Sequence, residues 1–235
     1  MKIYAVIPAR QGSLRFKNKN IQKFLGKELF LHSIYFAKKL KFISKIIFTT
    51  DSKKYAEILK KRIKNVEVHN RSKFAANDNS MEEDILFDLY EYFKKKKDFP
   101  DAILWLRPTH PLRCKKTFTN AFKKFVMKND TVLVVHANDP RLFKEKKGKL
   151  SPLIKGFEKR SMLRSQGLKP YYSIFSGEFF KFPNKYNKKF LGKNLRFVVA
   201  PKLTDFDIDL RDDLKLLNNM VKYNKKIFKR YIHSK

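Results

Sequence analysis

The chain has 235 residues, 43% of them hydrophobic, a balance typical of a globular protein rather than a disordered one. Its net charge of +33 comes from lysines spread along the whole chain without a nucleic-acid-reading motif, so we expect no dedicated nucleic-acid face. No apolar run reaches the ~18 residues of a membrane span, and the N-terminus lacks a signal-peptide pattern. The single cysteine, Cys114, has no partner for a disulfide. We therefore expect a cytoplasmic protein with no membrane partner.

Strand-like and helix-like segments alternate through the first part of the chain. Apolar and β-branched runs predict strands at 3–7, 45–49, 66–68, 102–106 and 131–136. Helical periodicity and capping residues predict helices at 28–40, 51–63, 80–97 and 115–128, with Asp51 or Ser52 capping the second. This alternation predicts an α/β fold with a mostly parallel sheet and helices on both faces.

The pattern changes after residue 137. Residues 138–170 are basic, contain glycines and prolines and have weak periodicity, so we expect a small insertion that acts as a lid or a dimer arm. Strand character returns at 171–182 and 195–200, and 212–224 predicts a closing helix. There is no internal repeat or low-complexity linker, and one domain over residues 1–235 is expected.

The first motif that can carry chemistry is the loop Pro8–Asn20, which follows the first strand. Ligands of open α/β sheets bind outside the carboxyl ends of the strands. Backbone N–H groups around Gly12 can hold phosphate oxygens, and Arg10 and Lys19 can neutralise a triphosphate. The loop matches neither the Walker pattern nor GxGxxG. Composition alone therefore leaves a phosphate site and a solvated basic loop equally open.

The second motif is Trp105–Arg113, where another strand runs into a polar turn. Two prolines fix the backbone direction, and Thr109, His110 and Arg113 supply polar groups. The alternative interpretation is an ordinary strand-to-helix turn with capping residues.

The third motif is the acidic segment Asp205-Phe206-Asp207-Ile208-Asp209. In an extended segment these three carboxylates lie on one face and repel each other unless a cation intervenes. Carboxylate oxygens suit Mg²⁺ bound together with substrate phosphates. Helix capping explains Asp212 and Asp213 but not Asp207 and Asp209, so we expect the latter two to bind the metal.

In their order along the chain, these motifs resemble those of the acylneuraminate cytidylyltransferase family, the CMP-sialic acid synthetases and their relatives for other nonulosonic acids. The segments that carry the resemblance extend over nearly the whole chain: Pro8–Ser13 with Lys19-Asn20 (P-A-R-x-G-S, then K-N), Thr49–Asp51 (S/T-T-D), Arg71 with 75–80, Pro108–Arg113 (P-T-S-P-L-R), and Asp207–Asp209 (D-I-D) followed by Asp213-Leu214.

The resemblance implies a Rossmann-like nucleotide-diphosphosugar transferase fold. It implies that CTP and a nine-carbon 2-keto acid sugar react to give the CMP-sugar and pyrophosphate, with Mg²⁺ as cofactor and with the sugar's C2 hydroxyl attacking the α-phosphorus. Surface glycans such as lipopolysaccharide, capsule or flagellin would receive the sugar. The insertion at 138–170 would match the family's dimerisation arm, so a homodimer is expected.

The resemblance also assigns roles to individual residues. The catalytic residues would be Arg10, Lys19 and Asp209, and the metal ligands Asp207 and Asp209. The nucleotide would contact Ala9, Arg10, Gly12, Ser13, Lys19, Asn20, Arg71, Ser80, Arg107, Pro108 and Thr109. The sugar would contact Thr109, His110, Arg141 and Arg164, with Lys144 an alternative to Arg141 for the sugar carboxylate.

The chain departs from the family pattern at several of these motifs. Arg107 stands where Gln is usual, His110 replaces Ser, and Leu14–Phe16 replaces the common K-G-(I/L)-P sequence. The family's R-P-N-G becomes Ile174–Gly177. Three alternatives therefore stay open: another acidic sugar such as an octulosonate, another nucleotide, or a basic binding protein without catalysis on the same fold.

Overall fold

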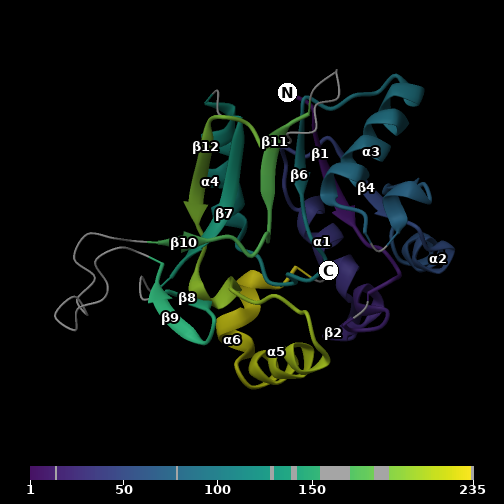
Figure 1. The fold of residues 1–235 in the computed structure, drawn as a ribbon. Coiled ribbons are helices and arrows are strands. Elements are labelled where there is room, and N and C mark those ends of the chain that lie inside the picture. The colour runs from purple at the N-terminus through teal and green to yellow at the C-terminus, as the bar shows by residue number, and fades with distance from the viewer. Residues whose placement is uncertain are drawn as a thin grey trace.

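The core of the protein is an eight-stranded sheet with helices packed on it (Figure 1). The computed structural model describes residues 1–13, 15–77, 79–127, 130–138, 142–153, 170–182 and 191–233. The strand order is β10-β7-β11-β6-β1-β4-β5, and β12 also pairs with β7. The strands of this sheet are β1 (Ile3–Pro8), β4 (Lys45–Thr50), β5 (Glu67–Asn70), β6 (Ala102–Trp105), β7 (Thr131–Ala137), β10 (Tyr171–Tyr172), β11 (Glu178–Lys181) and β12 (Leu195–Val199).

The sheet is parallel where the polar loops leave it. β1 lies between β4 and β6 and is parallel to both, and β4 is parallel to β5. β11 is antiparallel to β6 and β7, while β12 is parallel to β7. The prediction of a mostly parallel sheet is confirmed. The single strand expected at 171–182 is instead two strands, because the backbone between them turns through a positive φ of 56° at Phe175.

Helices cover both faces of the sheet, as predicted. The apolar sides of α1 (Leu29–Lys38), α2 (Lys53–Arg62) and α4 (Lys115–Val126) pack with alternate residues of β1 in one buried cluster. The other face of β1 and β6 packs against α3 (Glu82–Lys96). The closing helices α5 (Arg211–Tyr223) and α6 (Lys225–Phe228) bury a third cluster that includes Phe16, Phe24 and Leu112. This third cluster joins the end of the chain to the first loop.

The shorter elements lie mainly in the connections. They are η1 (Lys19–Ile21), β2 (Lys23–Phe24), β3 (Lys27–Glu28), η2 (Phe74–Ala76), β8 (Phe143–Lys146), β9 (Lys149–Pro152), η4 (Lys202–Thr204) and η5 (Lys229–Tyr231). The β8–β9 hairpin is the described part of the insertion expected at 138–170. Arg141 and Arg164 lie outside the described residues.

Side-chain hydrogen bonds explain two helix starts. The Ser52 hydroxyl accepts a hydrogen bond from the Tyr55 N–H, so Ser52 rather than Asp51 caps α2. Ser80 was expected to begin the third helix, but its hydroxyl donates to the Phe74 carbonyl at 2.6 Å and α3 starts at Glu82. None of the helices in the described residues is long and apolar enough to cross a membrane.

Candidate active site

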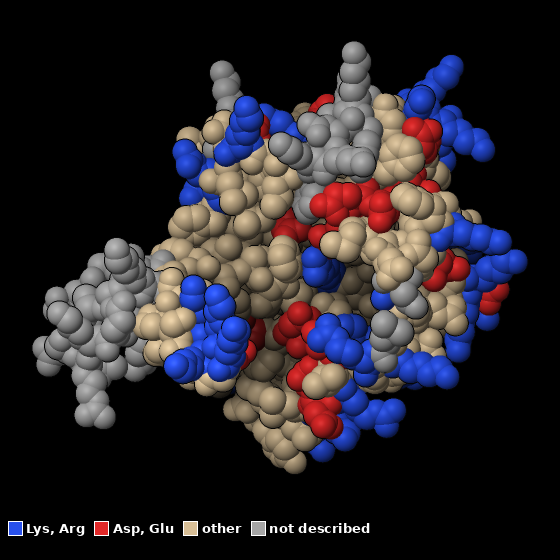
Figure 2. Space-filling model, viewed as in Figure 1, with Lys and Arg blue, Asp and Glu red and all other residues tan. Residues whose placement is uncertain are grey.

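A cavity of about 550 Å³ opens at the carboxyl ends of the parallel strands. In Figure 2 it is the hollow near the middle of the face shown, with basic side chains inside it and acidic side chains on either side. It is lined by Pro8, Arg10, Ser13, Arg15, Phe16, Lys19, Asn20, Arg71, Ala75, Asn77, Ser80, Met81, Glu82, Ile85, Trp105, Arg107, Pro108, Thr109, Asp207 and Asp209. All three motifs of the sequence therefore meet at one site.

The loop after β1 is shaped by hydrogen bonds to neighbouring strand ends. The Gln11 N–H donates to Asp51 Oδ1 at 2.9 Å, so the acid that follows β4 holds the start of the loop. The buried Asn20 closes the loop by donating from Nδ2 to the Arg10 carbonyl at 2.9 Å. These bonds hold Arg10 and Lys19 on the same cavity wall.

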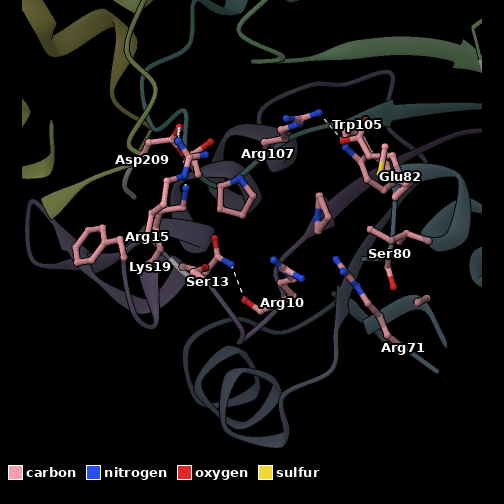
Figure 3. Close-up of a pocket in the computed structure, with 18 of the residues that line it drawn as sticks. Arg10, Ser13, Arg15, Lys19, Arg71, Ser80, Glu82, Trp105, Arg107 and Asp209 are labelled. Carbon is pink, nitrogen blue, oxygen red and sulfur yellow. Dashed lines mark hydrogen bonds and ion pairs between the residues drawn. The ribbon is translucent and has the colours of Figure 1, made fainter. Parts of the chain in front are cut away.

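Lys19 and Arg15 both pair with Asp209, which comes from the other end of the chain (Figure 3). Lys19 Nζ lies 2.7 Å from Asp209 Oδ1, and Arg15 Nη1 lies 2.9 Å from Oδ2. Burial alone would raise the pKa of Asp209, but the Lys19 hydrogen bond and the charges of Lys19 and Arg15 bring it below its ordinary value. Asp209 is therefore ionised at neutral pH.

Asp207 lies beside Asp209 in a different environment. Burial raises the pKa of Asp207 against a hydrogen bond from Thr109, and the charge of Asp209 adds to the rise. Among the described residues the contact of Asp207 within ion-pair distance is His110, whose Nε2 lies 3.6 Å from Asp207 Oδ1. The pKa of His110 is far below its ordinary value because the ring is buried and basic groups surround it, so this imidazole is neutral.

The loop after β6 is hydrogen-bonded to the acidic segment 205–209. The Ile208 N–H donates to the Thr109 carbonyl at 3.0 Å, and His110 Nδ1 lies 3.0 Å from the Phe206 carbonyl oxygen. Both contacts join the turn 108–110 to the segment that supplies Asp207. The metal-binding candidates and Thr109 are therefore fixed relative to each other.

Arg113 stabilises this turn through buried hydrogen bonds. Its fully buried guanidinium donates to the Ser176 carbonyl, the Ser33 hydroxyl and the Arg107 carbonyl at 2.8, 3.0 and 2.7 Å. Burial lowers the pKa of Arg113 to about 9, which keeps it cationic at neutral pH. One side chain thus ties together α1, the loop after β6 and the segment before β11.

Arg71 and Arg10 form a second basic pair on the cavity wall. Arg71 donates to the Thr49 hydroxyl at 3.1 Å and to the Thr49 carbonyl at 3.3 Å, and burial lowers its pKa to about 10. Arg10 Nη1 donates to the Asn77 carbonyl at 3.2 Å. Figure 3 shows Arg10, Arg71 and Ser80 on the same side of the cavity.

Glu82 and Arg107 line the end of the cavity away from Asp209, and the buried Glu178 lies close to both. We call these three residues the Glu82–Arg107–Glu178 cluster. Arg107 Nη2 lies 2.6 Å from Glu82 Oε1, and its guanidinium stacks 4.3 Å from the centre of the Phe175 ring. Glu178 on β11 is 1% exposed, and neither of its oxygens has a hydrogen-bond partner in the described part of the chain. Burial first, and then the charge of Glu82, raise its pKa to about 7, with Arg107 opposing.

The structure places most of the expected site residues at the cavity and a few elsewhere. Of the expected residues in the described ranges, Ala9, Gly12 and His110 do not line it, and neither does Lys144, the alternative to Arg141. The expectation that His110 touches the sugar does not fit, because its ring is fully buried behind Asp207. The expectation of three carboxylates on one face is wrong, since Asp205 turns away to Tyr172 and Lys202 while Asp207 and Asp209 line the cavity.

Sequence reasoning missed three charged residues. Arg15 lies in the stretch that departs from the family pattern, and Glu82 falls within the helix predicted at 80–97. Glu178 had a visible signal, since an acidic residue begins the otherwise apolar run 178–180. No group of three His, Cys, Asp or Glu side chains that could hold a metal ion is found among the described residues. The metal candidates remain the pair Asp207 and Asp209.

The chain is similar in sequence to known proteins. A family model described as cytidylyltransferase matches residues 4–90. The chain is 28% identical to the post-translational flagellin modification protein B of Campylobacter coli, over 94% of this chain and 95% of that protein. It is 36% identical to the CMP-N,N'-diacetyllegionaminic acid synthase of Legionella pneumophila, where the match spans 52% of each chain.

The fold matches that of solved structures. CMP:2-keto-3-deoxy-manno-octonic acid synthetase complexed with CTP has a TM-score of 0.68 to this chain at 14% identity, covering 95% of this chain and 100% of the other. At this identity the likeness shows the fold alone, and it confirms the expected nucleotidyltransferase fold. The family model covers residues 4–90, and with these relatives it shows that the chain is similar to cytidylyltransferases; this likeness marks the chain as a nucleotidyltransferase.

Proposed function

We propose that the chain transfers the cytidylyl group of CTP to the C2 hydroxyl of a nonulosonic acid and releases pyrophosphate. The observation that carries the proposal is the position of Asp207 and Asp209 on the same cavity as Arg10, Arg15 and Lys19. A reaction at a phosphorus atom needs alignment and charge neutralisation more than covalent help. The relative from Legionella, named a CMP-N,N'-diacetyllegionaminic acid synthase, supports a nonulosonic acid as the sugar.

The basic residues of the cavity suit the triphosphate. Arg10, Arg15 and Lys19 come from one loop and Arg71 from the end of β5, so their positive charges face one space. Guanidinium and ammonium groups form strong charge-assisted hydrogen bonds to phosphate oxygens. We propose that Arg10 and Lys19 hold the reacting phosphates, while Ser13, Asn20, Arg71, Ser80, Pro108 and Thr109 contact the rest of the nucleotide.

The carboxylate pair fits a divalent cation. The charge of Asp209 raises the proton affinity of Asp207, and Asp207 has only a neutral imidazole beside it within ion-pair distance in the described residues. Two hard oxygen donors of this kind suit Mg²⁺ when phosphates and water complete the ligand set. Mg²⁺ held there would withdraw charge from the phosphates and so favour attack at phosphorus. Lys19 and Arg15 keep Asp209 ionised and fix its orientation for that role.

Two further properties belong to the same proposal. The family resemblance of the insertion at 138–170 supports a homodimer, of which the β8–β9 hairpin would be part. Because the reaction consumes CTP, we propose that it takes place in the cytoplasm and supplies activated sugar for surface glycans. The flagellin modification protein of Campylobacter coli, 28% identical to this chain, supports that supply role.

The direct test is pyrophosphate release with CTP, Mg²⁺ and a panel of nonulosonic acids. We expect turnover with at least one acid and none with UTP or ATP at the same concentration. Lys19→Met should lower kcat at least a hundredfold, because it removes a charge placed at the phosphates. Lys17→Met is the matched control, since Lys17 is exposed and does not line the cavity. Wild-type protein that turns over no acid on the panel would refute the proposal.

A further inference from the structure

The Glu82–Arg107–Glu178 cluster is not needed by the phosphate and metal chemistry. It lies at the end of the cavity away from Asp209, and Figure 3 shows the Arg107 guanidinium directed toward Glu82. Two carboxyl groups accompany one guanidinium there, so the cluster as a whole does not attract a triphosphate or a sugar carboxylate. This end of the cavity therefore suits a neutral part of a substrate.

The hydrogen-bonding capacity of the cluster is only partly used. Glu82 Oε1 accepts from Arg107 Nη2, and the described residues give the second oxygen of Glu82 no partner. A guanidinium has five N–H groups, and only Nη2 of Arg107 is hydrogen-bonded within the described ranges. Glu82 and Arg107 are 28% and 31% exposed and both line the cavity. An acceptor and several donors thus stand side by side at the wall.

Buried polar groups lie close to this pair. The carboxyl of Glu178 and the indole nitrogen of Trp105 are buried without hydrogen-bond partners among the described residues, on neighbouring strands. The Phe175 ring supports the guanidinium from another side at 4.3 Å. Unpaired buried polar groups are costly, and they cluster where a ligand or ordered water completes the set. The arrangement is a built polar wall rather than a loose surface pair.

We propose that Glu82 and Arg107 bind an acylamino substituent of the sugar, with the Glu82 carboxylate accepting from the amide N–H and Arg107 donating to the amide carbonyl. A secondary amide offers one donor and one acceptor, which matches this pair. A hydroxyl group carries its donor and its acceptor on one oxygen atom, whereas the amide places them on two separate atoms that can each reach one of the two residues. The inference rests on the proposed function and makes Arg107 a residue of sugar selection instead of nucleotide contact.

The departure of the sequence from its family points the same way. Arg107 stands where the resembling family has Gln. The names of the relatives share the cytidylyl or CMP part, and they differ in the acid that is joined to it. A residue that differs from the family pattern is therefore better placed to read the variable sugar than the shared nucleotide.

The experiment measures KM for sugar and for CTP separately, using pyrophosphate release. The acids compared are a diacetamido nonulosonic acid and its analogue with hydroxyl groups at the same carbons. For wild type we expect kcat/KM at least tenfold higher with the acetamido acid. Glu82→Gln and Arg107→Gln should each raise KM for the acetamido acid at least tenfold and reduce that preference to threefold or less. KM for CTP should stay within twofold.

The control variant is Glu91→Gln, which changes an exposed carboxylate on the same helix and should leave both KM values unchanged. Circular dichroism and thermal unfolding verify that each variant is folded. A rise in KM for CTP alone would overturn the inference and assign the cluster to the nucleotide. Unchanged KM values in both cluster variants would overturn it as well. Failure of wild type to turn over any acid would instead refute the proposed function.

Discussion

Replacing Glu178 by Gln is expected to remove a loss of stability that the wild-type protein undergoes as the pH rises from 5 to 8. The pKa of this carboxyl rises from 4.5 to about 7, through burial first, then the charge of Glu82, with Arg107 opposing. The folded protein therefore keeps a proton that the unfolded chain releases between these two values. Stability from this group is fully present below pH 4.5 and is lost as pH rises through about 7.

The size of the effect follows from the same two values. One pKa unit corresponds to about 1.4 kcal/mol, and between pH 5 and 8 the linkage amounts to about 2.5 kcal/mol. Gln cannot ionise, so the free energy of unfolding of Glu178→Gln minus that of wild type should increase by about 2.5 kcal/mol over this range. The other titrating groups are the same in both proteins, and their contributions cancel in the difference.

Urea unfolding at pH 5, 6, 7 and 8 measures this difference. Trp105 is the single tryptophan and is 2% exposed beside Glu178 in the sheet, so its fluorescence reports the transition. Glu91→Gln serves as the control, because its side chain is 50% exposed and, among the described residues, its ion pair is with Lys94. A stability difference that stays constant from pH 5 to pH 8 would show that Glu178 is ionised in the folded protein throughout.

Three other substitutions test the scaffold of the site. Gly177→Ala should lower the free energy of unfolding by about 1–3 kcal/mol in urea titration, because the new Cβ would lie 2.2 Å from Cε1 of the buried Phe118 ring. Arg113→Met should cost about 3 kcal/mol and weaken CTP binding in calorimetry, since it leaves the Ser176 and Arg107 carbonyls without their donor. Ser52→Ala should cost about 1 kcal/mol through loss of the α2 cap, with nucleotide affinity unchanged; a loss of CTP binding there would contradict the assignment of Ser52 to the helix alone.

Local sequence signals predicted most of the fold. The β-branched run at 45–49 and the apolar run at 102–106 became β4 and β6 within one residue, because both are buried on each face and flanked by polar turns. The division of 171–182 was missed, since a bend at Phe175 has no local marker such as glycine at that position. Burial patterns fix elements well, whereas a single backbone reversal depends on tertiary contacts.

Some features of the candidate site could likewise be predicted from the sequence, and others could not. The loop Pro8–Asn20 and the pair Asp207 and Asp209 were foreseen because charge types and strand ends are visible in the sequence. The contact between Lys19 and Asp209 joins residues 190 positions apart, and no local pattern encodes it. The burial of His110 could not be foreseen either, since its Nδ1 contacts the backbone carbonyl oxygen of Phe206, 96 positions away.

The hydrogen bonds between Arg113 and the C-terminal residues have a consequence for folding during translation. The Arg113 N–H donates to the Tyr231 carbonyl, and His233 Nε2 lies 2.7 Å from the Arg113 carbonyl oxygen, 120 positions away. Ribosomes add about 5–20 residues per second, so a nascent chain waits on the order of ten seconds between making this turn and making its support. During that interval the first strands and their basic loop are already present, but the turn that carries Thr109 lacks its C-terminal contacts. The turn therefore gains these two contacts only after residue 233 has been translated.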